Sequence, residues 1–183
     1  MLVDFVGYLS DARISGRLQL PPVRLTDFLN GEDRYVLDLA SILDLATGHS
    51  TLQRRVLVAR DELYAVEATG FSGNPARRID TVPHPVSAQL GRFHVDGWLH
   101  VRPGVSVLAE LDARAPMVPL ADARLALVVA RSLAETDRGT VIVNRGHLDW
   151  LRADETIRPA FPGLPVAAHL ASPAPLAAPQ PAA

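Results

Sequence analysis

Hydrophobic and polar side chains alternate in two segments of similar length. In residues 12–20, apolar or small side chains at even positions are separated by arginine, serine and glutamine. In residues 93–101, apolar side chains at odd positions are separated by histidine, aspartate and tryptophan. A period of two residues is typical of a β-strand with one buried face. Each pattern contains an interior glycine, Gly16 or Gly97, which predicts a bend where the sheet curves.

The same order of elements is predicted after each alternating segment. A short helix-like connector comes first, then a long strand, a turn, and a final hairpin, whose turn in the second half contains Asn and Gly residues that suit φ > 0. In the first half these elements are residues 25–30, 35–45, 47–50 and the hairpin turn Arg60-Asp61, and in the second half they are residues 107–112, 117–129, 136–139 and the turn 144–146.

The two halves also match residue by residue, which indicates a duplication. Gly16 aligns with Gly97 at an offset of 81 residues, and the same offset aligns residues 39–40 with residues 120–121. At an offset of 85, residues 56–63 align with residues 141–148, so four extra residues are expected within 125–139. Two matching blocks in the same order make a tandem repeat the simplest explanation.

Composition shifts divide the chain into four parts. We predict an all-β fold in which residues 1–70 form a first five-stranded small barrel of SH3-like type and residues 87–153 form a second one. A Gly- and Pro-containing linker is expected at 71–86. An Ala- and Pro-rich tail is expected at 154–183, disordered because it lacks a patterned set of large apolar residues.

Composition and charge exclude several classes of function. The chain has no cysteine, which excludes disulfides, thiolate catalysis and cysteine-ligated zinc. Its net charge of -2 gives no basic total of the kind that marks nucleic-acid binding, although all 18 basic residues are arginine. The first ten residues carry Asp4 and no positive charge, unlike a signal peptide, and no apolar run approaches the ~20 residues of a membrane span. A cytoplasmic protein without a membrane partner is the expectation.

Three motifs together resemble the two-part motif of Sm-like proteins. They are the strand segment Gly16-Arg-Leu, the segment Leu120-Ala-Asp-Ala123 and the final hairpin Val141-Ile-Val-Asn-Arg-Gly-His-Leu148. The first copy departs from the motif because Asp61 stands where the second copy has Gly146. The chain also resembles a bacterial family of tandem small barrels of this kind.

The resemblance implies two Sm-like barrels that assemble through their edge strands, and many Sm-like rings bind RNA. It implies an RNA or anion contact at the final turns, formed by Arg60 in the first copy and by Asn144, Arg145 and Gly146 in the second. The helix-like connector between the second and third strands departs from the family and alters a loop that would contact RNA.

No catalytic, cofactor or metal motif is found, so we predict a protein that is not an enzyme and holds no cofactor. His94 and His100 would share a strand face but lie about 20 Å apart, too far to ligate one metal. Trp98 falls on the polar phase of its strand. It marks either an interface or stacking platform, or a cover over the barrel end against the other copy. The preferred function is a self-assembling homo-oligomeric scaffold or interaction module, and the alternative is an RNA- or nucleotide-binding ring.

Overall fold

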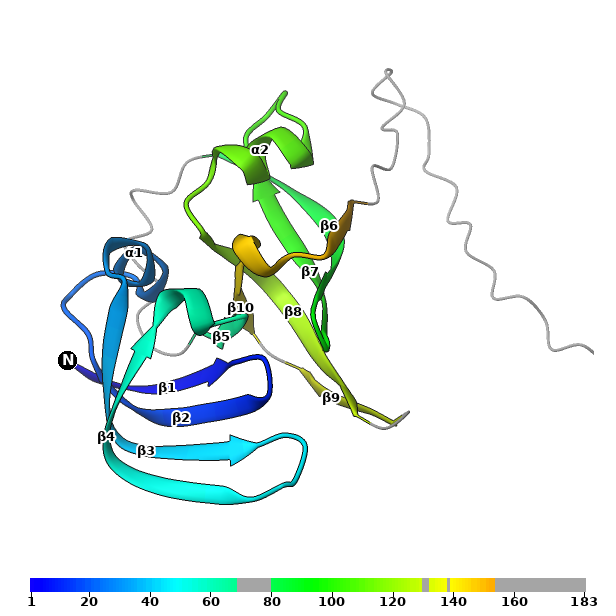
Figure 1. The fold of residues 1–183 in the computed structure, drawn as a ribbon. Helices are drawn as coiled ribbons and strands as arrows, with labels where there is room; N and C mark the ends of the chain where they lie inside the picture. Colours follow the sequence, from blue (N-terminus) through cyan, green and yellow to red (C-terminus); the bar gives the residue numbers. More distant parts are fainter. Residues whose placement is uncertain (69–79, 130–131, 138, 154–183) are drawn as a thin grey trace, which may run out of the picture.

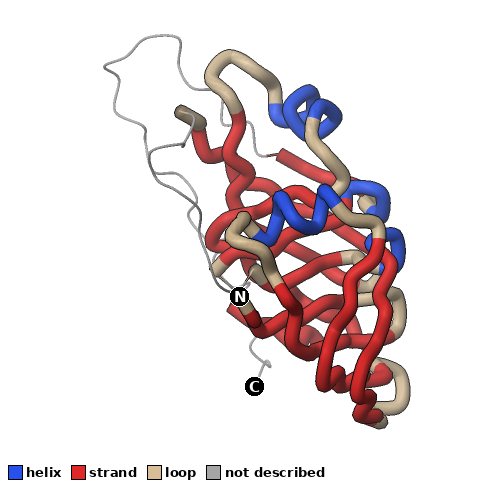
Figure 2. Tube along the Cα trace, turned by 90° about the vertical axis from the view of Figure 1, so that its left-hand side faces the viewer, coloured by secondary structure: helices blue, strands red, loops and turns tan. Residues whose placement is uncertain are grey.

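Antiparallel strands make up most of the structure, a computed structural model that describes residues 1–68, 80–129, 132–137 and 139–153 (Figure 2). Eleven strands join in a single sheet. Ten of them follow one another in the order β11-β6-β7-β8-β10-β5-β1-β2-β3-β4, and β9 pairs with β8. The predicted all-β class is therefore confirmed, with two short α-helices beside the sheet.

The first unit comprises five strands, one helix and one 3₁₀ turn. Its elements are β1 (Leu2–Tyr8), β2 (Ala12–Gln19), α1 (Leu25–Gly31), β3 (Arg34–Asp44), β4 (Ser50–Ala59), η1 (Arg60–Glu62) and β5 (Ala65–Glu67). The strands β1 to β4 follow one another in the sheet as they do in the chain, because short turns suffice to join antiparallel neighbours. The predicted long strand at 35–45 and the helical connector at 25–30 are found within one residue of their expected bounds.

The second unit repeats this order with one strand more. Its elements are β6 (Val82–Leu90), β7 (Phe93–Val101), α2 (Val107–Ala113), β8 (Met117–Val129), β9 (Ser132–Asp137), β10 (Thr140–Asn144), η3 (Arg145–His147) and β11 (Trp150–Ala153). In the sheet, β9 and β10 both pair with β8, as the longer β4 pairs with β3 in the first unit. Figure 1 shows the two units side by side, with β5 and β10 between them.

The strand registers confirm the repeat and correct its alignment. The pairing of β2 with β3 shifts at Gly16, opposite Leu39, and the pairing of β7 with β8 shifts at Gly97, opposite Asp122. Leu39 and Asp122 are the described non-glycine residues with positive φ, 51° and 45°. Leu39 therefore corresponds to Asp122, and the predicted match of residues 39–40 with 120–121 was wrong by two positions. Two of the four extra residues precede β8 and do not lie within 125–139.

The predicted barrels are not closed. Within the described residues β4 pairs with β3 and not with β5, so the expected final hairpin is wrong in both units. The 3₁₀ turns η1 and η3 instead carry the chain away from the preceding strand. β5 pairs with β1 of its own unit and with β10 of the second unit, so the sheet continues from one unit into the next.

Two predicted boundaries also need correction, and two predicted segments lie largely outside the described residues. β6 begins at Val82, inside the expected linker 71–86, so the second unit begins before residue 87. Pro83 and Pro85 of β6 lie outside the stretch 86–89 that pairs with β11. Proline has no backbone N–H, and at these two positions its absence costs no hydrogen bond with β11. β9 runs to Asp137, so the turn expected at 136–139 starts later. Residues 69–79 and the tail 154–183 are not described.

Each unit contributes side chains to the core of the other. The core of the first unit includes Met117 and Ile142 from the second, and the core of the second includes Tyr8 and Ala65 from the first. All four residues are less than one tenth exposed. Burial of such apolar surface is the main stabilising term in folding, so the two units stabilise one another.

Candidate functional site

The two arginine-bearing turns meet where the units join. The side-chain amide of Asn144 donates a hydrogen bond to the carbonyl oxygen of Arg60 at 3.2 Å. The ring of His147 stacks on the ring of Tyr64, with centroids 4.1 Å apart and planes 7° from parallel. The structure thus brings together the predicted contact residues of the first and second copies, which lie far apart in the sequence.

Most polar atoms of this cluster are used in holding the turns. Arg60 contacts a carboxylate oxygen of Asp33 at 2.6 Å, and its side chain is 19% exposed. Asn144 is buried, and its side-chain oxygen accepts a hydrogen bond from the backbone N–H of Gly146 at 3.0 Å. The Nε atoms of Arg60 and Arg145 are buried, with no hydrogen-bond partner among the described residues. The RNA or anion contact stays a prediction, and the arrangement favours a structural role for Arg60 and Asn144.

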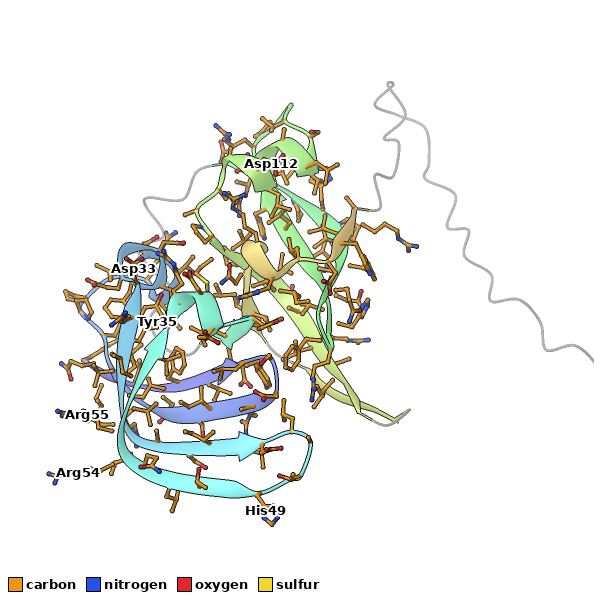
Figure 3. The ribbon with its side chains drawn as sticks, viewed as in Figure 1. Asp33, Tyr35, His49, Arg54, Arg55 and Asp112 are labelled. Atoms are coloured by element: carbon orange, nitrogen blue, oxygen red, sulfur yellow. The ribbon has the colours of Figure 1, made fainter. Side chains whose placement is uncertain are left out.

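Trp98 and the two adjacent arginines Arg54 and Arg55 lie on the surface. Trp98 lies on β7 and is 41% exposed, and both its role at an interface and its alternative role as a cover stay predictions. Arg54 and Arg55 project outward from β4 (Figure 3), and Arg55 forms an ion pair with Asp38 at 2.8 Å.

The junction, defined here as the contact of β5 with β10, is a strand pair between the units. Its register aligns Val141 with Glu67, Ile142 with Val66 and Val143 with Ala65. Val66 and Ile142 are completely buried. Next to this pair, Asn30 of α1 forms two hydrogen bonds with the backbone of Met117, each 2.9 Å long.

The free edges of the sheet are the counterparts of the junction strands. β4 is the first-unit counterpart of β10, and β11 is the second-unit counterpart of β5. These two strands end the order of the sheet, at opposite ends (Figure 1). Leu57, the counterpart of the buried Ile142, is 58% exposed, and Trp150, the counterpart of the buried Ala65, is 47% exposed. These free edges were not predicted from the sequence, although the 85-residue offset aligns Leu57 with Ile142.

A hollow in the second unit corresponds to a filled space in the first. It is lined by Leu108, Leu111, Asp112, Arg145, Leu148 and Leu151, among others. In the first unit, the counterparts Leu29, Leu63 and Val66 form one cluster with Met117 and Ile142 of the second unit. The first unit receives Met117 of β8 and Ile142 of β10 at this place. The second unit has an open hollow there, which can receive side chains from another chain.

Burial changes the acidity of one group beside the junction. Tyr35 at the start of β3 is 1% exposed, and its hydroxyl donates hydrogen bonds to the carbonyl oxygens of Leu29 and Glu32. Burial raises the pKa of Tyr35 to about 12, against a smaller opposing effect of the Arg60 guanidinium. The neutral phenol thereby ties β3 to both the last turn of α1 and the residue that follows it.

The described part of the chain has neither a metal-binding cluster nor a membrane-spanning helix. Within the described part of the chain, no cluster of three or more His, Asp or Glu residues is placed to hold a metal ion. The helices in that part are too short to span a membrane. Comparison with protein-family models, with curated proteins and with solved structures finds no match.

Proposed function

We propose that this protein is a self-assembling scaffold module of Sm-like units, in which copies join head to tail by pairing β4 of one chain with β11 of the next. The junction inside the chain carries this proposal, because it joins the counterparts of these two strands. Repetition of one contact between identical chains gives a heterologous assembly, which forms a ring if the rotation closes and a filament if it does not. Any closed ring of this chain contains an even number of units.

The register of the proposed contact follows from the junction. Transferred from the pairs of β5 with β10, it aligns Val56 with Arg152, Leu57 with Leu151 and Val58 with Trp150 of the next chain. Leu57 would leave its exposed position and take the place that Ile142 occupies in the junction. An edge strand with unpaired backbone groups and exposed apolar side chains is a ready template for such pairing.

The backbone of β4 directs the required groups to the free edge. In the second unit, Asn144 donates to the carbonyl oxygen of Tyr64, and Thr140 accepts from Ala68, so alternate residues of β10 face β5. These alternate residues are Asn144, Ile142 and Thr140. Their counterparts on β4, Ala59, Leu57 and Arg55, therefore face outward. The backbone N–H of Arg60, the residue after Ala59, donates to the carbonyl oxygen of Asp33, which precedes β3. Arg60 therefore faces β3, as the alternation requires.

The experiment compares two proline variants on the same free edge. Leu57→Pro removes an outward N–H inside the proposed contact and leaves the hydrogen bonds of β4 with β3 in place. Leu52→Pro removes an outward N–H outside the proposed contact, because the bond of Asp44 with His49 places the alternate residues 49, 51 and 53 toward β3. The mass of the unaltered protein in analytical ultracentrifugation is expected to be a multiple of the chain mass, retained by Leu52→Pro and lost by Leu57→Pro. An unaltered protein that stays a single chain at all concentrations would contradict the proposal.

A second candidate function, RNA binding, is favoured by the meeting of the turns η1 and η3. An assembly would repeat this pair of arginines once per chain and could build a basic patch despite the net charge of -2. Phosphate contacts release counterions, so affinity should fall steeply with salt and should be lost in an Arg145→Ala variant that still assembles. Binding of an A- or U-rich oligonucleotide that is insensitive to this substitution would contradict this candidate.

A further inference from the structure

A size exchange distinguishes the free edges from the junction. Inside the chain, the small Ala65 of β5 faces the core of the second unit, where the large Phe93 is completely buried. In the proposed contact between chains, the large and the small side chain exchange places. The counterpart of Ala65 on β11 is Trp150, and the counterpart of Phe93 on β2 is Ala12.

The correspondence of these four positions is fixed by strand pairing. Ala65 pairs with Tyr8 and Trp150 with Gln89, and these partners occupy the same place on β1 and β6. Ala12 pairs with Asp44 and Phe93 with Leu127, which occupy the same place on β3 and β8. The exchange is therefore a property of the fold and does not depend on a choice of sequence alignment.

Phe93 fills its space with help from the first unit. Its ring lies 5.5 Å from the ring of Tyr8, edge to face, and 6.0 Å from the ring of Tyr64. In the first unit, Ala12 leaves the corresponding space unfilled, and a cavity opens there between Ala12, Ile42 and residues 56–59 of β4. The lining of this cavity is predominantly apolar, and it lies beside the β4 residues that the proposed contact would pair.

We propose that Trp150 of one chain fills the cavity beside Ala12 in the first unit of the next chain. The inference rests on the proposed head-to-tail assembly and names the side chain that anchors it. In the transferred register Trp150 pairs with Val58, which lines the cavity, as Ala65 pairs with Val143 inside the chain. Between chains, the large Trp150 comes from β11 and the small Ala12 from the receiving unit. Inside the chain, the small Ala65 comes from β5 and the large Phe93 from the receiving unit, so each pair combines one large and one small side chain.

The surroundings make Trp150 the dominant apolar contact on its side of the interface. The junction residues Tyr8 and Tyr64 have the counterparts Gln89 and Asp149, and Glu67 has the counterpart Arg152. The contact between chains is therefore more polar than the junction. A buried tryptophan surrounded by polar groups is the usual composition of an interface hot spot.

The test exploits the size exchange. Trp150→Ala leaves the cavity empty and is expected to weaken association by roughly thirtyfold, a typical hot-spot loss. Ala12→Phe fills the cavity and is expected to block Trp150, with a loss of assembly. The double variant Trp150→Ala with Ala12→Phe recreates the Ala65 and Phe93 pair and is expected to restore assembly. Leu2→Ala, which removes an exposed apolar side chain from β1, away from both free edges, is the control and is expected to assemble normally.

Sedimentation velocity over a range of concentrations measures each association constant, and circular dichroism checks that each variant remains folded. An unaltered protein that never associates would overturn both proposals. Association that requires Leu57 but is unchanged in Trp150→Ala would overturn only the inference about Trp150. Equal losses in the two single variants without rescue in the double variant would also overturn it, because two unrelated defects would then add.

Discussion

Asn30 holds the backbone of Met117 by both of its polar atoms. Its amide N–H donates to the carbonyl oxygen of Met117, and its carbonyl oxygen accepts the N–H of Met117, each at 2.9 Å. The residues belong to α1 of the first unit and β8 of the second, and they are 87 positions apart in the chain. This pair of bonds fixes the helix of one unit on the first residue of a strand in the other.

Replacement of Asn30 by Ala should destabilise the fold through the junction. It leaves a partly buried N–H and C=O of Met117 without partners, which costs about 1–3 kcal/mol of unfolding free energy. Asn30→Asp keeps the acceptor and loses the donor, so an intermediate loss is expected. Denaturant melts measure the difference, with the exposed Asp27→Asn on the same helix as control. A loss for Asn30→Ala no larger than for the control would show that the clamp contributes little.

The counterparts of Asn30 and Met117 predict an ion pair between chains. Asp112 lies on α2 and lines the hollow of the second unit (Figure 3), and Arg34 is the exposed first residue of β3. In the proposed assembly, the Asp112 carboxylate takes the place of the Asn30 amide beside the backbone of Arg34, and we predict that the Arg34 guanidinium reaches it. Opposite charges in place of a neutral pair would favour head-to-tail contact over contact between like ends.

A charge exchange tests this ion pair. Asp112→Arg and Arg34→Asp should each weaken association several-fold, because each places like charges opposite one another. The variant that carries both changes should associate more tightly than either single variant. The dependence on ionic strength should be largest for the single variants, since salt screens repulsion between exposed charges. Additive losses in the double variant would show that the two side chains do not meet.

The matched glycines give a prediction for the bulges. A Cβ atom at Gly97 would lie 3.0 Å from the Cβ of Ala123, and one at Gly16 would lie 3.1 Å from the carbonyl oxygen of Asp38. Gly16→Val and Gly97→Val should therefore each lower the unfolding free energy by about 1–3 kcal/mol through overpacking. Gly31→Ala is the control, because no atom lies within 4 Å of its added Cβ. Unchanged denaturant midpoints for both valine variants would contradict a shared role at the bulges.

The sequence predicted the strands better than their partners. Alternation located β2 and β7, and the glycine in each marked a bulge, because a period of two and a missing side chain are local signals. Barrel closure was wrong because it depends on which strand β5 meets, and no local pattern distinguishes β4 of its own unit from β10 of the other. The alignment of residues 39–40 was wrong because the two extra residues that precede β8 lie in the connecting segments, and the αL conformation of Leu39, which marks the true match with Asp122, leaves no compositional trace.

The candidate site was also predicted only in part. The final turns were located by their composition at Arg60 and Arg145, and their meeting across the junction was not foreseen. Asn144 was assigned to an RNA contact because of its motif, whereas the structure gives it hydrogen bonds to Arg60 and Gly146. The exposed Leu57 resembles the buried Ile142 in type and phase, so only the fold reveals that one of these strands lacks a neighbour among the described residues.

Tyr35 predicts a loss of stability at high pH. Its pKa of about 12 in the folded protein exceeds the ordinary value of 10.0, so between these values the folded state holds a proton that the unfolded state has lost. Stability therefore falls as the pH rises, by up to about 1.4 kcal/mol for each pH unit in that window. Below about pH 9 this contribution is complete and constant.

The comparison with Tyr35→Phe isolates this contribution. The variant loses the hydrogen bonds to Leu29 and Glu32, so it should be less stable than the unaltered protein at pH 8. Between pH 9 and 11 its stability should fall less steeply, because the ionisation of Tyr35 contributes to the fall only in the unaltered protein. Chemical denaturation at half-unit intervals of pH measures both curves, and the difference between them should narrow as the pH rises. Parallel curves across this range would show that the Tyr35 phenol ionises at the same pH in the folded and unfolded states, and would contradict its burial beneath α1.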